Sequence, residues 1–202
     1  MKVKFSSIEI KGDLLPHTKD DVNQYKEIAS FILDAIGETP ITEITIDDKL
    51  LYFSSFLTTK LIEGILDNVY AYTSEIKGPK YLSGDVSMII SEAITYATLN
   101  ALYDVKLTNI IPFRSVKYLG TIVDAMIDLN YEEKLSKFIG SKGGVLFVNI
   151  RSSMNPRSYY LIDKLAKSLI NLEIVRYPDN YGLISMVIKD KNLKEIFIFI
   201  KP

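Results

Sequence analysis

The stretch VLFVNIRSSMNPRSYYLIDKLAKSLI, residues 145–170, joins a buried strand directly to a helix. Val145–Ile150 is a continuous apolar run, which is expected of a strand covered on both faces. Asn155 and Pro156 form an N-cap and first-turn pair. The residues predicted to face inward from the helix then recur at helical spacing: Leu161, Ile162, Leu165, Ala166 and Leu169. A buried strand followed by an amphipathic helix predicts an α/β fold.

The segments on either side extend this unit into a sheet. Upstream, Asn109–Phe113 is predicted to be a short buried strand, followed by a helix at Val116–Leu129. The strand at 109–113 is expected to pair in parallel with 145–150, as in a βαβ unit. Downstream, three further strands are predicted at Leu172–Tyr177, Leu183–Ile188 and Leu193–Ile200. The short polar turns between these three strands predict an antiparallel meander.

The first half supplies the remaining elements. Strands are predicted at Lys2–Ile10, Ile41–Ile46 and Val69–Ile76. Helices are predicted from the N-cap Thr18 to Gly37 and from Ser83 to Tyr103, and the segment Leu50–Leu66 is of ambiguous type. In the second half, a further short helix is predicted at Glu132–Ile139. Apolar residues change phase at Ser6–Ser7, which predicts a bulge or two short strands.

The expected architecture is three-layer-like, with helices packed on a mixed sheet. It has a parallel βαβ unit in the second half and a C-terminal antiparallel meander. Residues 1–202 are expected to form a single domain. The glycine- and proline-containing stretch 76–84 is the one candidate internal boundary, and we interpret it as a long loop.

The composition is that of an ordered globular protein, with 48% hydrophobic and 24% charged residues and a formal net charge of -1. The near balance of 24 Lys plus Arg against 25 Asp plus Glu disfavours a large electrostatic footprint for nucleic acid. The absence of cysteine excludes disulfides, thiolate chemistry and Cys-ligated zinc. The abundance of Ile, Lys and Tyr, with Gln24 as the single glutamine, is compatible with a thermophilic source.

The longest apolar stretch, Val86–Leu102, contains Glu92 and several hydroxyl side chains. That mixture predicts a buried or interface helix and not a membrane span. The apolar run at the N-terminus is too short for a signal peptide. The protein is therefore expected in the cytoplasm, without a membrane partner.

Arginine and serine residues follow both strands of the predicted parallel pair. In open α/β sheets, ligands collect outside the carboxyl ends of strands, where the N-termini of helices favour anions. Arginine offers bidentate donors to phosphate or carboxylate, and serine adds neutral donors. The predicted ligand-binding residues are Arg114, Ser115, Arg151, Ser152, Ser153, Asn155 and Arg157. A nucleotide or a phosphorylated metabolite is the expected class of ligand, while helix capping and ordinary ion pairs are the alternative explanation of these residues.

Other motifs predict little chemistry. Gly140–Gly144 has the composition of a phosphate loop, but it follows a helix and enters a strand, which predicts a structural turn. His17 is the single histidine, so neither a transition-metal site nor a Ser-His-Asp triad is expected. The carboxylate pairs are expected in turns or on solvated faces: Asp20–Asp21, Asp47–Asp48, Glu132–Glu133 and Asp124 with Asp128. The sequence assigns no catalytic residue and no cofactor.

The leading hypothesis is a homo-oligomer, a homodimer, that binds a small anionic ligand at the arginine and serine residues after the two strands. Two further hypotheses remain open. The first is a homo-oligomeric structural or interaction protein, with subunit contacts made by the helix at 84–103 and an apolar edge strand at 195–200. The second is metal-dependent processing of nucleic acid, with a metal ion held by Asp47.

Overall fold

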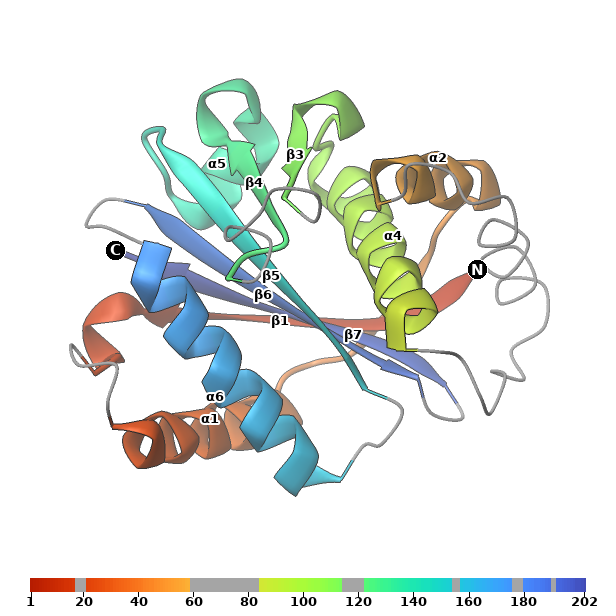
Figure 1. Cartoon of the computed structure of the whole chain (residues 1–202). Helices are drawn as coiled ribbons and strands as arrows, with labels where there is room; N and C mark the ends of the chain where they lie inside the picture. Colours follow the sequence, from red (N-terminus) through yellow and green to blue (C-terminus); the bar gives the residue numbers. More distant parts are fainter. Residues whose placement is uncertain (17–20, 59–83, 114–121, 154–156, 176–179, 190–191) are drawn as a thin grey trace.

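The computed structural model contains one seven-stranded mixed sheet with helices on both faces (Figure 1). It describes residues 1–16, 21–58, 84–113, 122–153, 157–175, 180–189 and 192–202. The strand order is β2-β1-β7-β6-β5-β4-β3. The strands are β1 (Lys2–Lys11), β2 (Thr42–Thr45), β3 (Ile110–Pro112), β4 (Ala125–Asp128), β5 (Val145–Ser153), β6 (Tyr181–Lys189) and β7 (Leu193–Lys201). The helices are α1 (Val22–Gly37), α2 (Asp48–Thr58), α4 (Gly84–Tyr103), α5 (Glu133–Ile139) and α6 (Ser158–Val175).

The predicted fold class is confirmed. Strand β5, helix α6 and strand β6 form a parallel βαβ unit, with β5 and β6 in register from Leu146 opposite Tyr181 to Ser153 opposite Ile188. Strands β6 and β7 then form an antiparallel hairpin. The parallel unit and the antiparallel pair thus share one sheet.

Three predicted details of the second half are wrong. Strand β4 lies between β3 and β5 and is antiparallel to both, so segments 109–113 and 145–150 are not parallel neighbours. The helix predicted at 116–129 contains β4, where Ala125 and Ile127 are buried and the residues between and after them are partly exposed. This alternation is the period of a strand. Residues 172–175 of the strand predicted at 172–177 form the end of α6, because Leu172 continues the buried stripe of that helix, and residues 176–177 lie outside the described residues.

The predicted bulge in the first strand is also wrong. Strand β1 pairs with β7 without interruption along residues 4–11. Its apolar residues change phase because the two halves of the strand are covered on opposite faces. Val3 and Phe5 belong to the hydrophobic clusters beneath α2 and α4, whereas Ile8 and Ile10 pack against the cluster beneath α1 and α6.

The other predicted elements of the first half are largely confirmed. Strand β2, helix α4 and helix α5 lie where a strand at 41–46 and helices at 83–103 and 132–139 are predicted. The ambiguous segment begins as helix α2, and the strand predicted at 69–76 lies outside the described residues. Helix α1 begins later than expected, because its N-cap is Asp21, whose side chain accepts a hydrogen bond from the backbone N–H of Gln24 at 3.0 Å.

The centre of the sheet explains the alternating Ile and Phe of β7. Ile196, Ile198 and Ile200 pack toward α1 and α6, whereas Phe197 and Phe199 pack toward α4. Strand β7 is therefore a central strand between β1 and β6, not the edge strand that the oligomer hypothesis assumed. Helix α4 is buried along Ile89–Leu99 within this single chain, where it packs on the sheet and against α2. Neither element needs a second subunit to cover it.

In the described part of the chain, no helix combines the length and the apolar character needed to cross a membrane.

Candidate functional site

The candidate site lies at the carboxyl ends of the parallel strands β5 and β6. Ser152 is the second-last residue of β5, and Lys189 is the last residue of β6. Both continue the strand phase that faces α4, since Ile150 and Val187 pack into the clusters on that side. Ser87, in the first turn of α4, lies over them. This edge of a parallel pair is where α/β sheets place ligands.

Ser87, Ser152 and Lys189 form a closed hydrogen-bonded triangle, named here the Ser–Lys cluster. The Oγ atoms of Ser87 and Ser152 lie 2.7 Å apart. Lys189 Nζ lies 2.9 Å from Ser87 Oγ and 3.1 Å from Ser152 Oγ, and it donates to the backbone carbonyl oxygen of Ser87 at 2.6 Å. Each polar side chain is therefore within hydrogen-bonding distance of the other two.

Lys189 is only 4% exposed. Burial, and to a smaller extent the positive charge of Lys164, lowers the pKa of its amine from 10.5 to about 7. The amine is therefore partly neutral near pH 7. A neutral amine carries a lone pair and can accept a proton from a hydroxyl group, which an ammonium cannot do.

Two more cations lie beside the last residues of β5. Lys164, on α6, donates a hydrogen bond from Nζ to the carbonyl oxygen of Ser152. Burial and the charge of Arg151 lower the pKa of the Lys164 amine. Burial also lowers the pKa of Arg151, while the nearby Asp124 acts in the opposite direction. Lys189, Lys164 and Arg151 thus influence one another across the end of a single strand.

The predicted ligand-binding residues are divided by the geometry of β5. Arg151 and Ser153 lie on one face of the strand, and Ser152 lies on the other, because successive side chains alternate. Ser153 is buried, at 4% exposed, and Arg157 is exposed immediately before α6. Arg114, Ser115 and Asn155 lie outside the described residues.

Three residues of the site were missed from the sequence: Ser87, Lys164 and Lys189. Each belongs to a different element from Ser152, and sequence spacing does not show which of them lie together. The position of Lys189 directly after the buried apolar run of β6 could have indicated a polar group at the end of that strand. Another signal was the position of Lys164, which adjoins the inward-facing Leu165 of α6.

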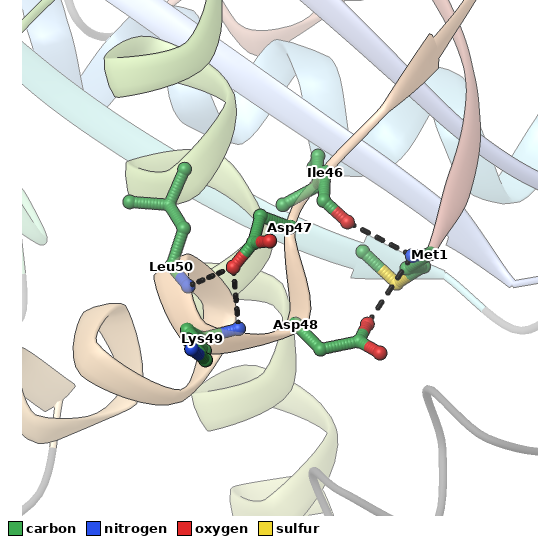
Figure 2. A network of polar contacts seen from close by, with 6 residues as sticks. All are labelled: Met1, Ile46, Asp47, Asp48, Lys49 and Leu50. Atoms are coloured by element: carbon green, nitrogen blue, oxygen red, sulfur yellow. Dashed lines mark hydrogen bonds and ion pairs between the residues drawn. The ribbon is translucent and has the colours of Figure 1, made fainter.

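The carboxylates considered for a metal ion have structural roles, shown for one pair in Figure 2. Asp47 caps α2, because its Oδ1 accepts hydrogen bonds from the backbone N–H groups of Lys49 at 2.8 Å and Leu50 at 3.2 Å. Asp48 lies 3.3 Å from the amino group of Met1. Among the described residues, no group of three or more His, Cys, Asp or Glu side chains is arranged to hold a metal ion.

Most remaining motifs are also structural. Gly140 ends α5 in the left-handed conformation, with φ of 68°, which confirms that residues 140–144 form a turn. Asp128 caps the short 3-10 helix at Leu129–Tyr131. Glu132 is buried and accepts a hydrogen bond from Asn109 Nδ2 at 2.7 Å. His17 lies outside the described residues.

A second buried polar group, the Glu195 cluster, lies further along the same side of the sheet. It consists of Thr95, Thr98, Ser185 and Glu195. Thr98 Oγ1 donates to Glu195 Oε2 at 2.5 Å, and Ser185 Oγ donates to Oε1 at 3.0 Å. Thr95 Oγ1 lies 2.7 Å from Ser185 Oγ. Burial raises the pKa of Glu195 to about 7, although these hydrogen bonds act in the opposite direction.

No family model, curated protein or solved structure matches this chain. The functional proposal therefore rests on the residues around Ser152.

Proposed function

We propose that the chain binds a small anionic ligand, such as a nucleotide or a phosphorylated metabolite, at the carboxyl ends of β5 and β6. The observation that carries the proposal is the gathering of Lys189, Lys164 and Arg151 around the last residues of β5. The charge of Lys164 lowers the pKa of Lys189, and the charge of Arg151 lowers the pKa of Lys164. A bound anion would relieve this repulsion.

The surroundings of these cations suit an anion of modest size. Ser87 and Ser152 supply neutral hydroxyl donors on the face of β5 toward α4, and Arg151 supplies a planar guanidinium on the opposite face, so the anion would bind beyond the end of the strand, where both faces can reach it. Helix α4 begins close to Ser152, so the positive end of its dipole adds to the field (Figure 1). Asp124 offsets part of the charge of Arg151.

Binding should depend on pH. An anion favours the protonated form of Lys189, so a bound anion raises the pKa of the amine above its value of about 7 in the free protein. Affinity is therefore expected to fall as pH rises from about 6 to 9, and binding near pH 7 to take up a proton.

The test is calorimetric titration with pyrophosphate, ATP and a sugar phosphate at pH 6 and pH 8. Lys164→Met and Arg151→Met should each weaken binding by about tenfold or more, the value of one charge-assisted hydrogen bond. Lys167→Met is the matched control, because Lys167 is an exposed lysine on the same helix as Lys164. It should change affinity less than twofold. Failure of all three anions to bind, or equal losses in Lys164→Met and Lys167→Met, would contradict the proposal.

A further inference from the structure

We propose that Ser152 is a nucleophile for which Lys189 is the general base, so that the site transfers the acyl group of an anionic ester to water. The inference rests on the proposed function, because Lys164 and Arg151 would hold the anionic part of the substrate while Lys189, in its neutral form, acts as the base. It adds the class of substrate, an ester that carries a phosphate or carboxylate, and the reaction at that ester.

The hydrogen-bond geometry provides the nucleophile and its base. Lys189 Nζ is 3.1 Å from Ser152 Oγ, within reach for direct proton transfer. The hydroxyl of Ser87 touches both groups, at 2.7 Å from Ser152 Oγ and 2.9 Å from Lys189 Nζ. A proton can therefore pass from Ser152 to Lys189 either directly or through Ser87.

The carbonyl of Ser87 orients the base. Lys189 Nζ donates to that carbonyl oxygen at 2.6 Å. A neutral amine also carries a lone pair, and Nζ lies 3.1 Å from Ser152 Oγ, from which it can accept the hydroxyl proton.

Ser152 is the better nucleophile of the two serines. Its side chain is partly exposed at the end of β5, whereas Ser87 is 8% exposed within α4. Lys164 is hydrogen-bonded to the carbonyl oxygen of Ser152 and places positive charge beside it. Negative charge develops on the carbonyl oxygen of an ester under attack, and a nearby cation stabilises that charge.

The reaction balances without a cofactor. Ser152 Oγ loses its proton to Lys189 Nζ and bonds to the ester carbonyl carbon; the bond from that carbon to the alcohol oxygen breaks. The departing alkoxide takes the proton back from Lys189 and leaves as the alcohol. Water then loses a proton to Lys189 and attacks the acyl-serine, which releases the carboxylic acid and restores the Ser152 hydroxyl. Burial supports this cycle, since it brings the pKa of Lys189 to about 7.

The experiment is covalent labelling with an alkyl fluorophosphonate, which loses fluoride when a serine oxygen bonds to its phosphorus. Mass spectrometry of the intact protein and of its peptides gives the rate and the labelled residue. We expect labelling of Ser152, with a rate that rises with pH around a midpoint near 7. Ser152→Ala should abolish the label. Ser30→Ala, a partly exposed serine on α1, should leave it unchanged.

Lys189→Arg separates the two proposals. Arginine keeps the positive charge but remains protonated, so it cannot serve as a base. This variant should still bind pyrophosphate within about threefold of the wild type, while labelling should fall at least about 100-fold. Lys189→Met should lose labelling to the same extent.

The outcomes are distinct. Absence of label on Ser152 in the wild-type protein, or labelling that is unaffected in Lys189→Arg, overturns the assignment of Ser152 as the nucleophile with Lys189 as its base. Label on Ser152 in a protein that binds none of the three anions overturns anion binding instead.

Discussion

The Ser–Lys cluster and the Glu195 cluster lie on the same side of one sheet, under the same helix, yet they differ in access. Each contains one buried ionisable group, and burial brings the pKa of both groups to about 7, from 10.5 for Lys189 and from 4.5 for Glu195. Glu195 is 0% exposed on β7, an inner strand between β1 and β6, where hydroxyl groups donate to both of its oxygens. Lys189 lies at a strand end beside the partly exposed Ser152.

The difference separates two uses of a buried charge. A buried carboxylate whose oxygens accept hydrogen bonds from fixed hydroxyls joins α4 to the sheet, and its removal leaves those hydroxyls unsatisfied. A buried amine at the end of a strand can exchange protons with a bound molecule. The first arrangement predicts a large effect on stability, and the second predicts a large effect on chemistry with a small effect on stability.

Stability should therefore respond very differently to loss of the two groups. Glu195→Ala removes the acceptor of Thr98 and Ser185 and leaves a cavity, so it should lower the free energy of unfolding by about 2–4 kcal/mol at pH 6. Lys189→Met keeps most of the side-chain volume and avoids burying an ammonium, so it should lower that free energy by less than about 1 kcal/mol. Urea denaturation at pH 6 measures both, and equal losses would show that the two clusters do not differ in role.

The pH dependence of stability should show two opposite slopes. Between pH 4.5 and about 7, the folded state keeps a proton on Glu195 that the unfolded state has lost, so stability falls as pH rises. Between about 7 and 10.5, the unfolded state keeps a proton that Lys189 has lost in the folded state, so stability rises with pH. Together these two groups predict a minimum of their joint contribution to stability near pH 7. The acidic slope is worth up to about 3 kcal/mol and the alkaline slope up to about 5 kcal/mol.

Two variants assign these slopes. Glu195→Gln should flatten the acidic slope and leave the alkaline one, and Lys189→Met should do the reverse. Urea titrations from pH 4 to pH 10 would measure this. An acidic slope that persists in Glu195→Gln would mean that another carboxyl group produces it.

Hydroxyl deletion gives the smallest expected difference. Thr98→Val removes a hydrogen bond to a carboxylate that is fully enclosed, and should cost about 1.5 kcal/mol at pH 8. Ser87→Ala removes a hydroxyl whose partners keep another contact, since Lys189 Nζ still lies 3.1 Å from Ser152 Oγ, and it should cost about 0.5 kcal/mol. Thermal unfolding of both variants at pH 8 provides the comparison. A greater loss of stability in Ser87→Ala than in Thr98→Val would indicate that the Ser–Lys cluster, like the Glu195 cluster, has a structural role.

Local sequence patterns were sufficient for the long elements of the fold. The alternation of Ile and Phe at 196–200 predicts a strand with two apolar faces, and the stripe from Leu161 to Leu169 predicts α6. Strand β4 was missed because four residues are too few for a period of two to be distinguished from helical spacing. The insertion of β4 between β3 and β5 depends on pairing between distant segments, which periodicity does not show.

The candidate site, like the fold, could be predicted from the sequence only where local patterns were enough. Arg151 and Ser152 could be found because the end of a buried strand is visible in the sequence. The partners of Ser152 could not be found in this way, since Ser87 is 65 residues before it and Lys189 is 37 residues after it. A lysine beside a turn is ordinarily expected to be exposed to solvent, and only the packing of α4 on the sheet shows that Lys189 is buried.

The central position of β7 affects how the protein can be made in the cell. This strand follows every other described strand in the chain, yet it lies between β1 and β6 and pairs with both. Until residues 193–201 have left the ribosome, the nascent chain can pair β1 with β2 and β3 through β6 with one another, but the open edges at β1 and β6 have no cover. Such edges bind other unpaired strands, and sheets closed by distant segments form slowly. The growing polypeptide therefore carries an open edge at β1 until residues 193–201 emerge, and an open edge at β6 from the time residue 189 emerges; chaperones that bind extended apolar segments would act on it at that stage.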